Sequence, residues 1–255
     1  MLLERTVKSS VKRIATSPLL GPLGHPLLRA VQYVLSLHHR EVVSYDQPER
    51  ASAIERVREI LADWPAQVMN ADEAYMIRTA VLSTAKVEGD LAEVGVFRGT
   101  SAKVICEAKG DRRLHLFDTF EGLPPASRFD AGFQAGQYAC SLESVRDYLK
   151  DFPSVQFYKG YFPVTGEPVK SLSFAFVHLD VDLFESTVAA LAFFYPRMNS
   201  GAILISHDYV AFAGVRKAFD GFFEHKPEPV IELSGNQCLV VKVTPRPADS
   251  RGRVS

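Results

Sequence analysis

Short runs of consecutive apolar residues alternate with segments of helical spacing along most of the chain. Apolarity that is continuous, rather than confined to every second position, indicates strands buried on both faces of a sheet. The apolar runs cover residues 91–97, 114–120, 155–162, 172–182 and 202–209. The helical segments cover residues 101–108, 144–152, 187–194 and 215–223. This succession predicts parallel strands joined by right-handed helical crossovers.

Both ends of the chain depart from this rhythm. Residues 229–233 and 237–243 are strand-like and are separated only by Ser-Gly-Asn, which predicts a terminal antiparallel hairpin. Residues 1–60 have helix-like patterning that several prolines interrupt. A helix is predicted to begin after Asn70, because Glu73 follows at the spacing of a capping box.

These patterns predict an α/β fold with a doubly wound, mostly parallel seven-stranded sheet, a terminal antiparallel hairpin and a helical N-terminal extension. We expect a helical extension or lid over residues 1–69, the main domain over 70–244 and a flexible tail over 245–255. The tail is rich in Pro, Arg and Ser and contains too little apolar surface to offset the entropy lost on ordering.

Composition narrows the range of partners. The 255 residues carry a formal net charge of -1, which argues against nucleic acid as a partner because binding to phosphates needs a basic face. Cys106, Cys140 and Cys238 lie far apart with no Cys-x-x-Cys pair, so a reducing cytoplasm is expected and a thiolate zinc site is not. No apolar run approaches the roughly 20 residues that span a bilayer.

Basic residues outnumber acidic ones in the first forty residues and lie among apolar residues. Such a segment could touch a membrane surface as an amphipathic helix. The alternative, a packing or dimerisation arm with a solvated basic face, is favoured because Gly21-Pro22 and His25-Pro26 interrupt a long helix. Because a dimerisation arm is one of these alternatives, the chain could form a homo-oligomer.

The first apolar run ends in a turn that contains Gly95 and Gly99. These glycines allow a ligand to approach the backbone, or they serve only the geometry of the turn. Thr100 or Ser101 is predicted to cap the following helix and to leave N–H groups free for an anionic ligand group. Glu93 favours a ligand with positive charge over a pyrophosphate, and S-adenosylmethionine carries both a sulfonium and an amino group.

Acidic side chains are predicted at the ends of later strands. Asp118 ends the second strand about 20 residues after the glycines, where two hydrogen bonds can hold a ribose diol. Asp180 and Asp208 end the fourth and fifth strands, on the same rim as the glycine turn. Two carboxylates with open positions beside them suit magnesium. A hydroxyl acceptor could be polarised there.

Histidines and a third acid accompany this pair. His207 is a poor ligand for magnesium but a good one for manganese, iron, nickel or zinc, and it could instead act as a metal-free general base. Asp182 is more typical of a residue that supports the ligands from behind or of an acid at a helix N-terminus, and His178 of a histidine in the core. Phe129, Phe133 and Tyr138 either line an acceptor pocket or pack their loop onto the core.

Five segments resemble the macrocin O-methyltransferase family: residues 87–100, 116–124, 159–162, 179–187 and 206–209. The most specific is Leu116-Phe-Asp-Thr-Phe-Glu-Gly-Leu-Pro124, and the match spans about residues 70–243. The resemblance implies a class I, Rossmann-like enzyme that depends on S-adenosylmethionine and methylates sugar hydroxyls on natural products beside a bound magnesium ion. Two departures are visible: His207 replaces the first of two consecutive acids, and Val181 replaces a glycine.

The resemblance implies cofactor-binding roles for particular residues, and the chemistry of the acidic strand ends gives the catalytic and metal-binding candidates. Asp180 and His207 are the expected catalytic residues, and Asp180, His207 and Asp208 the expected ligands of magnesium or manganese. Tyr161 is expected on the adenine side of the cofactor or in the core. The expected cofactor-binding residues are Glu93, Gly95, Phe97, Gly99, Thr100, Asp118, Phe120 and Tyr161.

The leading hypothesis is a metal-assisted S-adenosylmethionine-dependent O-methyltransferase in the cytoplasm. Its acceptor would be a hydroxyl of a sugar, on a small-molecule natural product or on a surface glycan. The alternative is a noncatalytic cofactor-binding or scaffold protein with a degenerate metal site. An NAD-dependent oxidoreductase ranks last, because the Gly-x-Gly-x-x-Gly fingerprint is missing.

Overall fold

The computed structural model describes residues 47–64 and 69–243. The chain divides by its contacts into residues 1–51 and residues 52–255, and the second unit carries the sheet. The predicted basic arm and the predicted tail over 245–255 lie outside the described residues. None of the helices in the described part of the chain combines the length and the apolarity needed to cross a bilayer.

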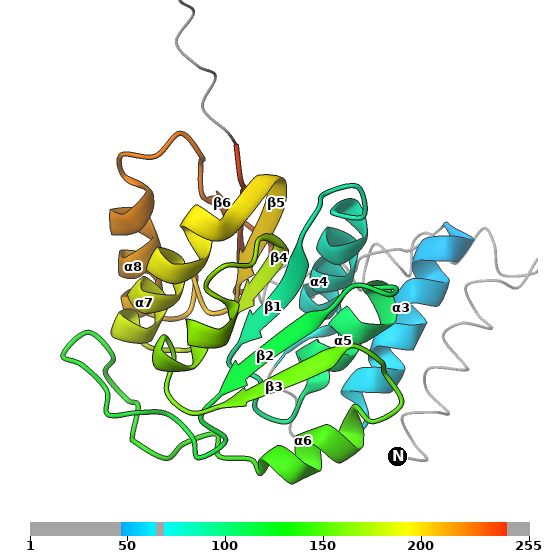
Figure 1. Cartoon of the computed structure of the whole chain (residues 1–255), viewed down its shortest axis with the longest axis horizontal. Coiled ribbons are helices and arrows are strands. Elements are labelled where there is room, and N and C mark those ends of the chain that lie inside the picture. The colour runs from blue at the N-terminus through cyan, green and yellow to red at the C-terminus, as the bar shows by residue number, and fades with distance from the viewer. Residues whose placement is uncertain (1–46, 65–68, 244–255) are drawn as a thin grey trace, which may run out of the picture. The chain divides into compact units, whose positions relative to one another are not determined.

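Helices and strands alternate along the chain as the apolar runs predict (Figure 1). The described elements are α3 (Pro48–Leu61), α4 (Ala71–Ser83), β1 (Asp90–Val94), α5 (Thr100–Ala108), β2 (Leu114–Asp118), α6 (Leu142–Tyr148), β3 (Val155–Lys159), the 3-10 helix η1 (Val164–Val169), β4 (Phe174–Leu179), α7 (Phe184–Phe194), the 3-10 helix η2 (Tyr195–Arg197), β5 (Met198–Ser206), α8 (Ala213–Phe223), β6 (Ile231–Glu232) and β7 (Cys238–Val241).

The strands form one seven-stranded sheet in the order β3-β2-β1-β4-β5-β7-β6. The first five strands pair in parallel, β7 pairs antiparallel with β5, and β6 pairs antiparallel with β7. The predicted fold class and terminal hairpin are thus confirmed. The strand order reverses between β1 and β4, the place where open α/β sheets bind their ligands.

The central strands bury side chains on both faces of the sheet. On β1, Leu91 faces a core shared with α4 and α5, whereas Ala92 and Val94 face a second core shared with α7 and α8 (Figure 1). All three are less than 5% exposed. This burial on two sides explains why the strands read as continuous apolar runs.

The capping box predicted at the start of α4 is present. The Asn70 side chain accepts hydrogen bonds from the N–H groups of Asp72 and Glu73, at 2.9 and 3.0 Å. The Glu73 carboxylate accepts the N–H of Asn70 at 2.9 Å in return. Caps of this kind stabilise a helix by about 1 kcal/mol.

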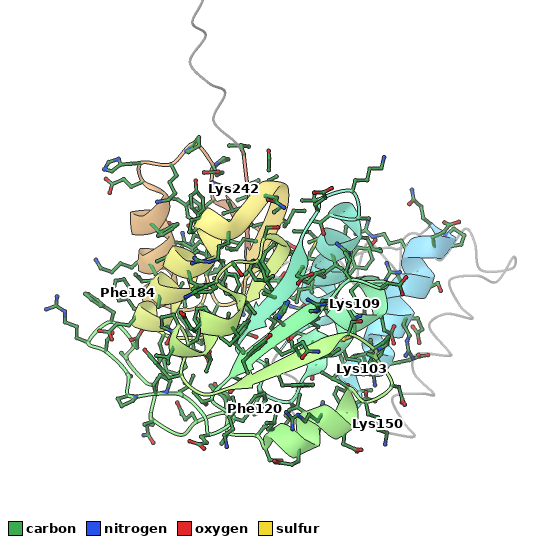
Figure 2. All side chains as sticks on the ribbon, in the orientation of Figure 1. Lys103, Lys109, Phe120, Lys150, Phe184 and Lys242 are labelled. Carbon is green, nitrogen blue, oxygen red and sulfur yellow. The ribbon has the colours of Figure 1, made fainter. Side chains whose placement is uncertain are left out.

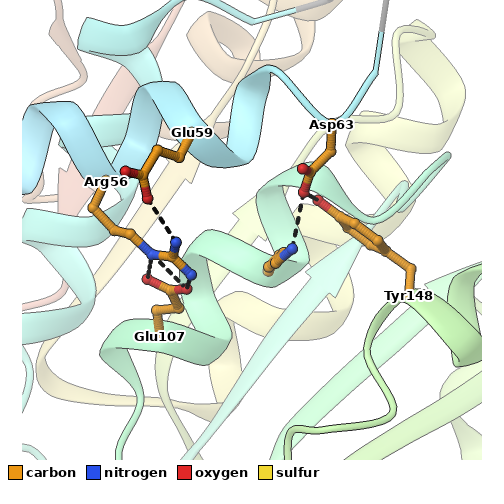
Figure 3. A network of polar contacts seen from close by, with 6 residues as sticks. Arg56, Glu59, Asp63, Glu107 and Tyr148 are labelled. Carbon is orange, nitrogen blue, oxygen red and sulfur yellow. Dashed lines mark hydrogen bonds and ion pairs between the residues drawn. The ribbon is translucent and has the colours of Figure 1, made fainter.

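Helix α3 joins the main core through its last turns. Val57, Ile60 and Leu61 are buried with residues of α4 and α5. Polar contacts surround them (Figure 3): Arg56 pairs with Glu59 and Glu107, and Asp63 accepts from Lys103 at 2.9 Å and from the Tyr148 hydroxyl at 2.7 Å. Residues 52–61 of α3 thus belong to the same unit as the sheet.

Candidate functional site

A cavity of about 320 Å³ opens at the carboxyl ends of the parallel strands. Loops that follow β1, β2, β3, β4 and β5 contribute to its wall. The long loop between β2 and α6, green in Figure 1, contributes Leu123, Pro124 and Tyr138. Its volume lies within the range of small-molecule sites. The wall residues are Val94, Gly95, Phe97, Phe117, Asp118, Thr119, Gly122, Leu123, Pro124, Tyr138, Gly160, Tyr161, Phe162, Asp180, Val181, Asp182, Ser186, His207, Asp208, Ala211, Phe212 and Asn236.

Left-handed backbone conformations gather at this edge of the sheet. Phe97, Phe120, Asp182 and Asp208 follow four different strands and have φ values of 47°, 54°, 59° and 64°. Such a conformation costs a residue with a side chain about 1–3 kcal/mol and persists where the surroundings enforce it. Three of these residues line the cavity, so the strain turns side chains into the site.

The glycine turn contributes only part of what the sequence predicts. Gly95 and Phe97 line the cavity, whereas Gly99 and Thr100 are not among its described wall residues. The prediction that Thr100 or Ser101 caps α5 is wrong. Gly99 itself occupies the N-cap with φ 82°, and no side chain in the described chain caps it. Thr100 and Ser101 therefore lie inside the first turn, where a side chain cannot take the capping position.

Glu93 lies away from the cavity. It pairs in register with His178 of β4, so both side chains point to the same face of the sheet, toward α4 and α5. The Glu93 Oε1 atom lies 2.8 Å from His178 Nδ1, and both residues are fully buried. The structure gives Glu93 no wall position from which to contact a cofactor. His178 is a core histidine, as expected, although its Nε2 has no hydrogen-bond partner among the described residues.

Asp118 lies on the cavity wall but already accepts several hydrogen bonds. Its Oδ2 accepts the N–H groups of Val96 and Phe97 at 2.7 and 2.9 Å, and its Oδ1 accepts that of Phe120 at 2.7 Å. The Thr119 hydroxyl lies 3.4 Å from the same Oδ1, but it donates its single proton to the nearer Gly122 carbonyl at 2.7 Å. One lone pair on Oδ1 therefore remains for a ribose hydroxyl, where the sequence led us to expect two hydrogen bonds.

Aromatic side chains of the predicted set divide between the cavity and the core. Tyr161 is 45% exposed on the cavity wall, which excludes its core alternative. Phe120, labelled in Figure 2, is buried and is not among the described wall residues. Tyr138 lines the cavity with its ring edge-to-face against Phe97.

The other two loop aromatics pack onto the protein. The Phe129 ring lies against Phe184, and the Phe133 ring lies against Phe212. The three loop aromatics thus divide between the two expected roles, lining the cavity and packing the loop onto the protein. Tyr138 reaches the cavity, while Phe129 and Phe133 hold the loop to the start of α7 and the segment before α8.

Asp180, His207 and Asp208 converge on the cavity. One ligand atom from each lies within 4.8 Å of the others. The His207 Nδ1 atom is 3.0 Å from an Asp208 oxygen and 3.6 Å from an Asp180 oxygen. Asp182 joins them on the wall beside the candidate ligands, which fits the first of the two alternatives expected for it. Helix α7 starts at Phe184, and the carboxylate that accepts the Phe184 N–H belongs to Asp130.

Burial and mutual repulsion perturb this cluster. Burial raises the pKa of Asp180 to about 6, with His207 opposing and Asp208 adding to the rise. Burial together with the charges of Asp180 and Asp208 raises the pKa of Asp182 to about 9. Burial alone would lower the pKa of His207, but Asp180 and the contacts with Asp208 and Glu73 raise it to about 11. The cluster therefore favours a cation.

This arrangement fits a divalent cation. Two carboxylates face each other beside an imidazole nitrogen, and positive charge between them relieves the repulsion that raises the pKa of Asp180. Mixed oxygen and nitrogen donors suit manganese better than magnesium. His207 would have to release the Nδ1 proton to serve as a ligand.

Glu73 is a site residue that the sequence pattern did not reveal. Its Oε2 atom lies 3.5 Å from His207 Nε2, and its Oε1 accepts the N–H of Asn236, a residue of the cavity wall, at 2.8 Å. The sequence shows Glu73 only as the partner of Asn70 in a capping box. No local signal connects it with the end of β5, since the fold alone brings the two together.

The cavity lies where the strand order reverses, on a sheet with the order β3-β2-β1-β4-β5-β7-β6. These two features place the chain in the class of Rossmann-like methyltransferase folds. Residues 25–235 match the sequence profile of the family described as Macrocin-O-methyltransferase (TylF). The chain belongs to that family, and the resemblance seen in its motifs is confirmed. It is thus a member of a family of O-methyltransferases.

Two curated relatives come from Streptomyces. The 8-demethyl-8-(2,3-dimethoxy-alpha-L-rhamnosyl)-tetracenomycin-C 4'-O-methyltransferase of Streptomyces olivaceus is 35% identical over 142 residues, which are 48% of this chain and 54% of that protein. The match thus spans about half the length of that relative. Demethyldecarbamoylnovobiocin O-methyltransferase of Streptomyces niveus is 29% identical over 72% of this chain and 78% of its own.

Solved structures agree with the fold. The O-methyltransferase NovP is 26% identical, with a TM-score of 0.61 over 74% of this chain and 88% of that chain. The calicheamicin methyltransferase CalS11 has a TM-score of 0.58 over 78% of this chain and 94% of its own, at 19% identity. The latter likeness concerns the fold alone.

Proposed function

We propose that the chain is an S-adenosylmethionine-dependent O-methyltransferase that methylates a sugar hydroxyl of a glycosylated natural product, with a divalent metal ion at the acidic cluster. The name of the Streptomyces olivaceus relative specifies O-methylation of a rhamnosyl tetracenomycin, which supports this acceptor class over a surface glycan. The Streptomyces niveus relative is named as an O-methyltransferase of a novobiocin derivative. The cytoplasmic location stays a prediction.

One observation carries the proposal. Asp180, His207 and Asp208 lie on the wall of the same cavity as Gly95, Asp118 and Tyr161. Cofactor-binding and proton-accepting groups must share one cavity, because the methyl group passes directly from sulfur to oxygen. The negative wall also matches the sulfonium and ammonium charges of the cofactor.

The chain supplies positions for each part of the cofactor. Asp118 would accept one ribose hydroxyl through its free Oδ1 lone pair, and Tyr161 would cover the adenine side. Gly95 and Phe97 would border the methionine part. S-adenosylmethionine, when bound, supplies an electrophilic methyl group on sulfur.

Asp180 is the best candidate for the base. It is partly exposed to the cavity, and in the metal-free cluster its pKa of about 6 leaves it ionised near neutrality yet able to accept a proton. Asp180 would accept the hydroxyl proton as the new bond between the methyl carbon and the acceptor oxygen forms and the sulfur–methyl bond breaks. S-adenosylhomocysteine and a methyl ether would be the products.

Asp180, His207 and Asp208 would hold the metal ion, which would supply a Lewis acid for the acceptor oxygen. His207 cannot act as the base in the metal-free cluster, because a pKa of about 11 keeps its ring protonated there. Its charge would instead stabilise the carboxylates around it.

Methyl transfer from labelled S-adenosylmethionine to a rhamnosyl tetracenomycin with free sugar hydroxyls, and to demethyldecarbamoylnovobiocin, tests the proposal. We expect turnover by the unsubstituted chain, inhibition by a chelator, and a loss of about 10²–10⁴-fold in kcat for Asp180→Asn. The exposed Asp147→Asn is the matched control. Cofactor binding without turnover on any glycoside, with Asp180→Asn indistinguishable, would favour the noncatalytic alternative.

A further inference from the structure

The Glu73 carboxylate is fixed from several sides. Oε2 accepts the N–H of Asn70 at 2.9 Å, and Oε1 accepts that of Asn236 at 2.8 Å. Gly235 presses against it so closely that a Cβ there would lie 2.5 Å from Oε1. The residue is 4% exposed. The carboxylate therefore keeps its position without help from His207.

His207 presents its two ring nitrogens to different partners. Nδ1 faces Asp208 and Asp180 on the cavity side, whereas Nε2 faces Glu73 Oε2 at 3.5 Å. Nε2 is buried and has no hydrogen bond within the described part of the chain. A separation of 3.5 Å is an ion-pair contact, and a small rotation of the ring would turn it into a hydrogen bond.

We infer that Glu73 is a positioning residue: its carboxylate retains the proton on Nε2 of His207, so that the lone pair of Nδ1 is directed at the metal position. A carboxylate behind a ligating histidine fixes the ring orientation and makes the histidine a better ligand. The inference rests on the proposed function only in using Nδ1 as a ligand. Glu73 would then have a second role besides its part in the capping box of α4. Through Glu73, α4 and the β6–β7 turn would support the acidic cluster.

Glu73→Gln tests the inference by calorimetric titration of the full chain with Mn²⁺ alone. The amide keeps one acceptor oxygen, so it can still accept one of the two backbone N–H groups, but it cannot hold a proton on Nε2 by charge. We expect the dissociation constant for Mn²⁺ to rise by about 10–100-fold. Asn70→Ala is the matched control, because it removes the cap without touching His207. It should lower the melting temperature and leave the affinity for Mn²⁺ unchanged.

A double-mutant cycle isolates the pair. In a His207→Ala background, Glu73→Gln should cause no further loss of Mn²⁺ affinity. If Glu73→Gln does not fold, Glu73→Asp keeps the charge but withdraws the carboxylate from Nε2, and the same loss is expected.

Several results would overturn the inference: unchanged Mn²⁺ affinity in the folded Glu73 variants, an equal loss in Asn70→Ala, or a loss that persists without His207. An unsubstituted chain that binds no Mn²⁺ would overturn it as well. S-adenosylmethionine binding and methyl transfer, measured on the same samples, decide the proposed function separately.

Discussion

A Cβ atom on Gly95 would lie 1.8 Å from the backbone carbonyl oxygen of Asp180. The turn after β1 is thus in direct contact with the end of β4, and Gly95 also has φ 85°. Turn geometry is therefore enough to require this glycine. The same contact fixes the cofactor turn relative to the expected base.

Gly95→Ala should unfold or severely destabilise the protein. The added methyl group meets backbone, which cannot move aside without separating β1 from β4. We therefore expect the free energy of unfolding to fall by more than ~3 kcal/mol. Gly110→Ala is the control, because Gly110 has φ 62° but no atom within 4 Å of an added Cβ. The Gly110→Ala variant should lose only about 1 kcal/mol of its free energy of unfolding. Urea unfolding of both variants measures the difference, and equal losses would contradict the steric account.

The sequence predicts the sheet well because the relevant signals are local. Continuous apolar runs mark strands buried on both faces, and the Asn70 capping box marks the start of α4. The convergence of Asp180 and Asp208 also follows, since carboxyl ends of neighbouring parallel strands share one edge.

Side-chain direction at strand ends is harder to predict. Glu93 is still within β1, so the pleat turns it toward α5, whereas Asp182 lies beyond β4 and a left-handed backbone turns it into the cavity. A difference of one or two residues in the strand boundary decides between these outcomes. The contact between Glu73 and His207 depends on tertiary structure and has no sequence pattern at all.

His207→Asp restores two consecutive acids and should shift the metal preference toward magnesium. Replacing an imidazole by a carboxylate favours the harder ion. We expect Mg²⁺ affinity to increase roughly tenfold relative to Mn²⁺, which corresponds to ~1.4 kcal/mol. Calorimetry with each ion checks this, and the exposed His225→Asp controls for charge. An unchanged ratio would exclude His207 from the ligand set.

Glu228 should contribute stability that is lost in acid. Burial alone would raise its pKa, but hydrogen bonds from Tyr195 and from the N–H of Val243 lower it below the usual value. A lowered folded-state pKa gives stability that is complete above the unfolded value near 4.3 and disappears as the pH falls through the folded value.

Glu228→Gln is therefore expected to lower the free energy of unfolding by about 1–2 kcal/mol at pH 7 and by close to nothing at pH 2–3. Denaturant titrations across this range provide the measurement. The exposed Glu224→Gln removes the same charge and should show no comparable pH dependence. A constant difference between Glu228→Gln and the unsubstituted chain from pH 7 to pH 2 would refute the linkage.

Asp130 should control the loop between β2 and α6. Its Oδ1 accepts the N–H of Phe184, labelled in Figure 2, at the start of α7, and its Oδ2 accepts the N–H of Ser127. Asp130→Ala removes the acceptor for an otherwise uncapped helix, at a cost of about 1 kcal/mol, and frees the loop that carries Tyr138 to the cavity. Proteolysis within residues 124–137 should accelerate.

Ser127→Ala is the matched control for this substitution, because it removes a hydroxyl contact with Asp130 and leaves the Phe184 N–H capped. If the loop positions the acceptor, Asp130→Ala should raise KM for the glycoside more than KM for S-adenosylmethionine, and Ser127→Ala should change neither by much. Since Phe129 and Phe133 also hold the loop, the fold should survive. Identical proteolysis and KM values in the two variants would show that the aromatic contacts alone fix the loop.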